Sequence, residues 1–224
     1  MGGQACVLYG AAEFSRDADL AIVADARNLA RLQQSLDELL AKCIAVPPFE
    51  ARYLEMGLAV HFRCRHPEAS GLRVDVMSRM RGVDSFAALW DRRTTLELEN
   101  EHIDLMSLPD LVQAKKTQRP KDWPMIARLV EANYFQHRDL ASAEQIAFWL
   151  KELRSAGPLI DVARRFSAEC TATIGSRPLL ALAQAGEPTP LEAALLAEEQ
   201  RERDTDRAYW LPLKQELERL RRRQ

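Results

Sequence analysis

The hydrophobic pattern of this chain changes near residue 109, and that change limits the folds open to it. Before this point, strand-length apolar runs alternate with helical stretches, and after it apolar residues recur at helical spacing. We therefore predict an α+β fold: a small mixed or antiparallel sheet flanked by helices, followed by a helical C-terminal half. The same change predicts two domains, residues 1–107 and 108–224. The predicted strands are residues 4–9, 18–24, 58–64 and 72–77, with two short extended pieces, TLELEN and HIDLMS, around residue 100.

Helix signals mark the segments between and after these strands. Residues 26–42 place leucines on one face at helical spacing, and the turn PEASG joins the strands at 58–64 and 72–77. Ser107 is a suitable N-cap with Pro109 close behind it, and Pro120 and Pro124 confine the start of the next helix. Further along, the sequence predicts a helix over SAEQIAFWLKELRS stopped by Gly157 and Pro158, one more over residues 158–173, a loop at AGEPTP and a long charged helical end.

Composition excludes several classes of protein. A formal net charge of −2 over 224 residues gives no overall basic field for nucleic acid, and no apolar run approaches the ~20 residues that span a bilayer. The four cysteines have no paired spacing, so we expect reduced thiols in a cytoplasmic chain without membrane partners. His61, Cys64 and His66 suggest zinc, but a zinc site needs a second ligand pair and the sequence has none at matching spacing.

Two acids stand one residue apart at the start of a predicted strand. Asp17 and Asp19 precede the apolar run LAIV, and residues i and i+2 of a strand point to the same face. Like charges held this close cost free energy unless a positive charge lies between them. Magnesium would supply that charge, because it prefers hard oxygen ligands.

A third acid lies inside another apolar strand. Asp75 stands between two valines in LRVDVM, a costly position unless the carboxylate is paired or binds a metal. Structural explanations are open for all three acids: Arg73 or Arg79 could neutralise Asp75, Asp17 could belong to a turn, and Asp19 could simply face solvent. Taken singly, each acid favours such a role, whereas the three together favour a two-metal site for phosphoryl transfer.

Four segments in order carry a family resemblance: a glycine pair followed by a predicted strand, YG…SRDADLAIV, LRVDVM and LPDLVQAKKTQRPKDW. Together they resemble the nucleotidyltransferase superfamily with the polymerase-beta-like fold, and most closely its subset related to AbiEii-like abortive-infection toxins. The resemblance covers residues 2 to about 130.

The resemblance implies roles for particular residues. Asp17, Asp19 and Asp75 would be the catalytic acids and would hold two magnesium ions, while Gly2 and Gly3 would contact the incoming triphosphate.

In the fourth segment, Lys115 or Lys116 together with Arg119 would neutralise phosphate charge, and Asp122 would orient these basic side chains.

The function implied is magnesium-dependent transfer of a nucleoside monophosphate from a nucleoside triphosphate to an acceptor hydroxyl. The acceptor would be an RNA end or a protein side chain, as in toxin-like members, and a second copy or an antitoxin would be the partner. The alternative is a catalytically degenerate module of the same fold that binds a nucleotide or a partner protein. Two departures from the family pattern motivate it: the glycine pair at residue 2 has no helix before it, and no second acid follows Asp122.

Overall fold

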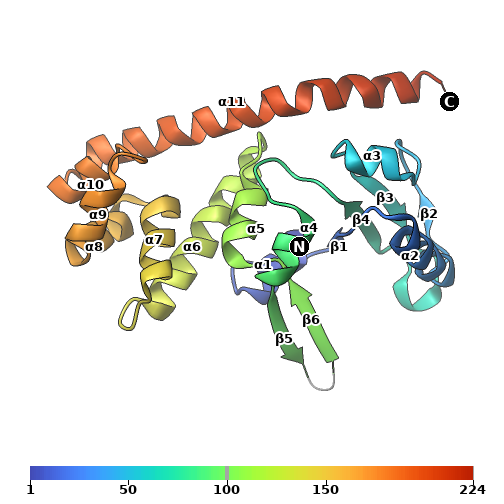
Figure 1. The fold of residues 1–224 in the computed structure, drawn as a ribbon, viewed down its shortest axis with the longest axis horizontal. Coiled ribbons are helices and arrows are strands. Elements are labelled where there is room, and N and C mark those ends of the chain that lie inside the picture. Colours follow the sequence, from blue (N-terminus) through green and yellow to red (C-terminus); the bar gives the residue numbers. More distant parts are fainter. Residues whose placement is uncertain (99–100, 224) are drawn as a thin grey trace. The chain divides into compact units, whose positions relative to one another are not determined.

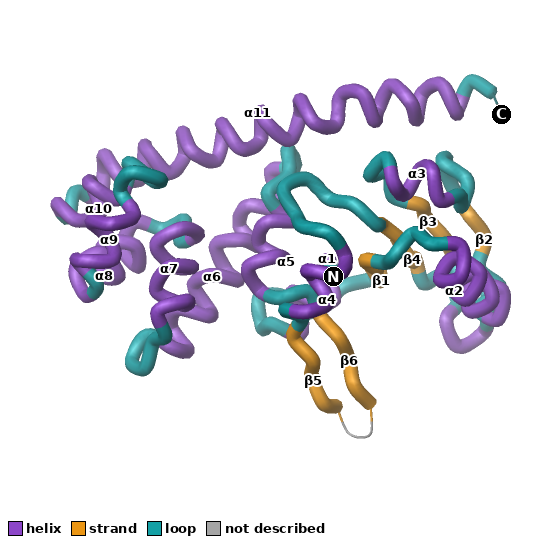
Figure 2. The backbone as a smooth tube through the Cα atoms, viewed as in Figure 1, coloured by secondary structure: helices purple, strands orange, loops and turns teal. Residues whose placement is uncertain are grey.

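The computed structural model describes residues 1–98 and 101–223 and divides the chain into two compact units (Figure 1). The first unit comprises Met1–Ala114 with Ala208–Gln224, and the second comprises Lys115–Arg207. The strands all belong to the first unit (Figure 2), so the predicted α+β fold with a helical C-terminal half is confirmed. The second unit begins at Lys115, a few residues after the boundary at residue 107 that the sequence pattern predicted. The intervening residues belong to α5 (Leu108–Lys115), where Asp110 forms an ion pair with Arg92 of the first unit.

The first unit is built on a mixed four-stranded sheet in the order β1-β4-β3-β2. The β1 strand runs parallel to β4, while β3 runs antiparallel to both β4 and β2. The predicted turn PEASG lies between β3 and β4 and contains the 3₁₀ turn η1 (Pro67–Ala69). The strands are β1 (Asp17–Ala21), β2 (Lys42–Cys43), β3 (Val60–Arg63) and β4 (Arg73–Met77).

One face of this sheet is apolar, and the helix α2 (Ala26–Glu38) supplies side chains that pack with it. Val60, Phe62, Val74 and Val76 alternate with polar residues along β3 and β4, and each is at most 5% exposed. They form one core cluster with Leu36 of α2. Because the apolar side chains fill this face, the residues between them point to the opposite face of the sheet.

Residues 4–8 belong to a helix and Tyr9 caps its end, so our prediction of a strand over residues 4–9 was wrong. The helix is α1 (Gly2–Leu8), in which the adjacent residues Ala5 and Cys6 are both fully buried. A half-buried strand would alternate buried and exposed positions instead. An apolar run as short as QACVLY does not distinguish a strand from a buried helix by periodicity.

The first unit also contains a separate antiparallel hairpin, as predicted from the two extended pieces. It pairs β5 (Thr94–Leu98) with β6 (Glu101–Leu105), and Glu99 and Asn100 of the predicted piece TLELEN lie outside the described residues. Two short helices, α3 (Ala51–Glu55) and α4 (Phe86–Asp91), complete the segment before the hairpin.

The last part of α11 (Pro188–Arg221) packs within the first unit beside α3. Leu213, with the partly buried Tyr209, contacts Tyr53 and Leu58 in a second core cluster. A Cβ atom on Gly57 would lie 2.6 Å from the Tyr209 hydroxyl, so this close approach requires glycine. Among the described residues, no helix, α11 included, is both long and apolar enough to cross a membrane.

The second unit is helical, and its helix boundaries differ from our predictions at more than one place. The helix over SAEQIAFWLKELRS ends at Glu152, and Gly157 and Pro158 lie in the first turn of the next helix, where proline loses no intrahelical hydrogen bond. The single helix predicted over residues 158–173 is two helices. The elements are η2 (Pro120–Asp122), α6 (Trp123–His137), α7 (Ala143–Glu152), α8 (Ala156–Arg165), α9 (Ser167–Thr173) and α10 (Leu180–Ala185).

An ion pair between the buried Asp110 of α5 and Arg92, the residue that follows α4, gives a pH-dependent prediction. Both oxygens of Asp110 accept from Arg92 at 2.7 Å, and Ser107 Oγ donates to Asp110 at 2.6 Å. Burial alone would raise the pKa of Asp110, but the hydrogen bonds from Arg92 and Ser107 outweigh it and hold that pKa below its ordinary value.

We expect Asp110→Asn to lower the free energy of unfolding by about 2 kcal/mol at neutral pH. A lowered folded-state pKa stabilises the fold above the unfolded value of about 4, and this contribution is lost as the pH falls further. The gap between wild type and variant should therefore narrow in acid, as followed by urea denaturation at several pH values. Asp84→Asn is the control, because Asp84 pairs with the same Arg92 but is 64% exposed. If the two variants lost the same free energy of unfolding, the burial of Asp110 would not explain the effect.

Candidate active site

The polar face of the four-stranded sheet gathers the three predicted acids. Across the parallel pair of β1 and β4, Asp19 lies opposite Asp75 and Asp17 lies opposite Arg73. On the other side of β4, His61 of β3 lies opposite Asp75. Directly paired residues share a face of the sheet, so these five side chains occupy one surface. We call Asp17, Asp19 and Asp75 the acid cluster.

Asp75 is held by two neighbours on this face. Arg73 donates to both of its oxygens, from Nε to Oδ1 at 2.8 Å and from a terminal nitrogen to Oδ2 at 2.9 Å. His61 Nδ1 lies 2.9 Å from Oδ1. The Asp75 side chain is 13% exposed, and burial would raise its pKa, but His61 and Arg73 outweigh that effect and lower it. Asp75 is therefore a stable carboxylate, and of the two arginines considered from the sequence it is Arg73 that neutralises it.

All three acids raise the pKa of Arg73. Its pKa is raised first by the hydrogen bond to Asp75, then, against the effect of burial, by the charges of Asp75, Asp17 and Asp19. Three carboxylates thus share one face of the sheet with a single guanidinium, and carboxylate oxygens are donors that a hard divalent cation takes. As the side chains stand, the described residues contain no group of three acidic, histidine or cysteine side chains that could hold a metal. The donor chemistry fits magnesium once the guanidinium is no longer bound to Asp75.

The glycine pair makes room for the acid cluster at the start of α1. Gly3 N–H donates to Asp19 Oδ2 at 3.2 Å. Gly2 has φ of +69°, and a Cβ atom there would lie 1.9 Å from Asp19 Oδ2. A Cβ atom on Gly3 would lie 2.3 Å from Ser15 Oγ. Gly2 therefore allows Asp19 to approach the backbone of α1, and Gly3 does the same for Ser15, roles that the sequence alone did not suggest.

His61 and Arg73 are the neighbours of the acid cluster whose roles the sequence did not assign. Arg73 also places a terminal nitrogen 3.1 Å from His61 Nδ1. A guanidinium only donates, so Nδ1 accepts from Arg73 in one tautomer and donates to Asp75 in the other. The sequence grouped His61 with Cys64 and His66, but Cys64 lies in the core cluster and His66 accepts from Glu68 N–H. The three residues are separated because β3 ends at Arg63, and His66 caps the 3₁₀ turn η1.

The predicted phosphate-binding residues belong to the second unit. Lys116 is buried and forms an ion pair with Glu152 at 2.8 Å, and burial lowers its pKa despite that partner. Lys115 is partly exposed, and its backbone carbonyl accepts from Thr117 N–H at 2.8 Å. Arg119 donates through Nε to Asp122 Oδ2 at 2.7 Å, so Asp122 does contact the basic side chain that it was predicted to orient. Of the three basic residues predicted to bind phosphate, Lys115 and Arg119 are therefore the accessible ones.

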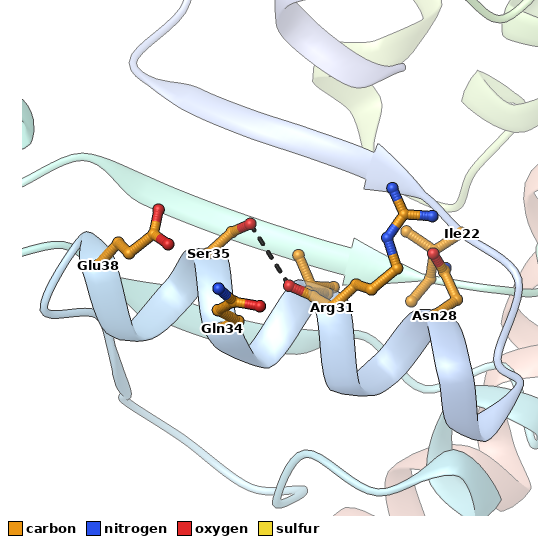
Figure 3. A pocket seen from close by; sticks show the side chains of 7 residues that line it. Ile22, Asn28, Arg31, Gln34, Ser35 and Glu38 are labelled. Atoms are coloured by element: carbon orange, nitrogen blue, oxygen red, sulfur yellow. Dashed lines mark hydrogen bonds between the residues drawn. The ribbon is translucent and has the colours of Figure 1, made fainter.

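A shallow hollow of 370 Å³ lies along α2 in the first unit (Figure 3). Six of the seven residues lining it come from this single helix, among them Arg31 and Glu38, and the seventh is Ile22. Ser35 Oγ donates to the carbonyl oxygen of Arg31 within it. None of its lining residues belongs to the acid cluster, so the chemistry predicted from the sequence does not reside there.

Comparison with known proteins finds no match to this chain among protein-family models, curated proteins or solved structures.

Proposed function

We propose that this chain is a magnesium-dependent nucleotidyltransferase that moves a nucleoside monophosphate from a nucleoside triphosphate to an acceptor hydroxyl. The observation that carries the proposal is the register of β1 and β4, which places Asp19 opposite Asp75 with Asp17 on the same face. Three carboxylates from two adjacent strands can hold divalent cations against a triphosphate, and the motif resemblance to nucleotidyltransferases points to the same chemistry.

The residues would divide the work as follows. Asp17 and Asp19 would ligate magnesium, and Asp75 would complete the site, where two ions when bound would neutralise phosphate charge and lower the pKa of the acceptor hydroxyl. The acceptor oxygen would form a bond to the α-phosphorus while the bond to the pyrophosphate oxygen breaks. Following the motif resemblance, Lys115 and Arg119 would neutralise phosphate charge, and Arg119 has terminal nitrogens suited to two parallel bonds.

The acceptor that we propose is an RNA end or a protein side chain, following the resemblance to toxin-like nucleotidyltransferases. Label position tests the reaction class. With magnesium and total cellular RNA, α-labelled nucleoside triphosphate should leave label on RNA or on protein, whereas γ-labelled triphosphate should leave none. Transfer of the γ-label would indicate a phosphoryl transferase and contradict the proposal.

One observation favours a second candidate function, a degenerate module that binds a nucleotide or partner without turnover. Both oxygens of Asp75 are already bound by Arg73, as they would be if an arginine had permanently replaced the metal. Such a module would bind nucleotide without transferring either label. It would also retain its nucleotide affinity when magnesium is removed with a chelator.

Gly2 gives a prediction that distinguishes a steric clash with Asp19 from backbone strain alone. Gly2→Ala should lower transfer at least about tenfold, because its Cβ would displace the Asp19 carboxylate from the site. Gly10→Ala is the matched control: Gly10 has a similar φ of +75°, but a Cβ there meets no atom within 4 Å. Transfer rates for both variants, measured on folded protein, test this. Equal rates in the two variants would show that Asp19 need not lie against Gly2.

A further inference from the structure

We propose that Arg73 is an exchangeable counter-ion: it neutralises the acid cluster in the ligand-free protein and moves to the triphosphate when a divalent cation binds Asp75. This inference rests on the proposed function, because it assigns Arg73 as a phosphate ligand of the same site. Its starting point is the pair of bonds from Arg73 to both oxygens of Asp75, with the charges of Asp17 and Asp19 acting on the same guanidinium.

Arg73 and a divalent cation cannot both occupy Asp75 in this arrangement. The guanidinium uses both carboxylate oxygens, and His61 Nδ1 faces Oδ1 as well. A cation ligated by Asp75 would also lie within a few ångströms of the guanidinium, where like charges repel strongly at the low effective dielectric of a half-buried site. Binding of the cation therefore requires Arg73 to leave Asp75.

The surroundings of Arg73 permit this movement. Its side chain is 35% exposed, so the guanidinium has access to solvent, whereas Asp75 is only 13% exposed. When Arg73 leaves, His61 in the Nδ1–H tautomer still donates to Asp75 Oδ1, so the buried carboxylate keeps one protein partner. A carboxylate with one oxygen hydrogen-bonded and the other free is a suitable cation ligand.

Nucleoside triphosphate supplies the new partner for Arg73. A guanidinium binds phosphate oxygens through two parallel bonds, the same geometry that it now uses on Asp75. The position of Arg73, opposite Asp17 in the sheet register, puts it beside the acids that would carry the metal–triphosphate complex. Removing Arg73 should therefore have opposite effects on the two ligands: tighter binding of the bare cation and weaker binding of the metal–nucleotide complex.

The experiment measures the affinity of the full chain for both ligands, the bare cation and the metal–nucleotide complex. Free Mn²⁺ is counted by electron paramagnetic resonance during titration, and binding of the α,β-methylene analogues of the four nucleoside triphosphates is measured in excess magnesium. For Arg73→Gln we expect Mn²⁺ affinity to rise at least about tenfold and analogue affinity to fall at least about tenfold. Arg63→Gln is the matched control, because it removes the same charge from the residue opposite Arg73 in the register of β3 and β4. Within residues 1–98 and 101–223, the Arg63 side chain donates to the carbonyl oxygen of Gly71 and forms no ion pair with an acid. It should change both affinities by less than about twofold.

Several outcomes would overturn the inference. Unchanged Mn²⁺ affinity in folded Arg73→Gln protein shows that Arg73 does not compete for the cluster, and unchanged analogue affinity shows that it does not bind phosphate. If Arg73→Gln does not fold, Arg73→Lys keeps a charge but loses the paired bonds, and its Mn²⁺ affinity must still exceed that of wild type. If both affinities shift as expected while no α-label is transferred, the proposed function fails and the role of Arg73 stands.

Discussion

Asp17→Asn and Asp19→Asn should each reduce nucleotidyl transfer by about a thousandfold or more, the range in which single charge-stabilising groups act in phosphoryl transfer. The amide keeps the size of the carboxylate but loses the negative charge that would hold a divalent cation. The fold should survive, because both side chains are only partly buried and each substitution removes repulsion within the acid cluster. Initial rates of α-label transfer, together with thermal unfolding of each variant, measure the two effects separately.

The control for these substitutions is Glu97→Gln. Glu97 is also a strand carboxylate of the first unit, but it is 83% exposed on β5 and lies outside the acid cluster. Its transfer rate should stay within about twofold of wild type, as expected for a surface substitution. A folded Asp19→Asn protein with near-normal transfer would remove the acid cluster from the reaction.

Lys116→Met should destabilise the second unit by about 3–5 kcal/mol, because it leaves Glu152 buried without the partner that now lies 2.8 Å away. Both side chains are about 5% exposed, so water cannot replace the lost ion pair. Glu152 keeps a contact to Arg154 at 3.2 Å, which places the expected cost nearer the lower end of the range. Denaturant unfolding followed by circular dichroism gives the free energy.

Two further variants test whether the ion pair is responsible. Lys115→Met removes the neighbouring lysine, which is partly exposed, and should cost less than about 0.5 kcal/mol. The double variant Lys116→Met/Glu152→Met should be less destabilised than the sum of its single variants, because no buried charge remains unpaired at that contact. Equal costs for Lys115 and Lys116, or simple additivity in the double variant, would show that packing alone explains the effect.

The sequence predicts best where a local pattern decides the structure. The strand at residues 72–77 was predicted in this way, and in β4 Val74 and Val76 lie in the core while Asp75 lies on the opposite face. Ser107 was a predictable helix start, because its side chain meets the N–H of Asp110 within one turn. Both features depend on neighbours only a few residues apart.

The sequence predicts poorly those features that depend on contacts between distant segments of the chain. The helical conformation of residues 2–8 depends on burial of Ala5 and Cys6 within the first unit, which an apolar run of this length does not reveal. The choice between Lys115 and Lys116 depends on Glu152, which lies 36 residues farther along the chain from Lys116. Arg73 was visible beside Asp75, but only the strand register shows that it also faces Asp17.

The most direct test is transfer from α-labelled nucleoside triphosphates, in magnesium and total cellular RNA, by wild type and by the Asp17→Asn/Asp19→Asn double variant. We expect label on RNA or on protein with at least one of the four nucleotides, and none above background with the folded double variant. Equal labelling by the two proteins, or no labelling by either, would show that the acids on the polar face of the sheet do not catalyse nucleotidyl transfer.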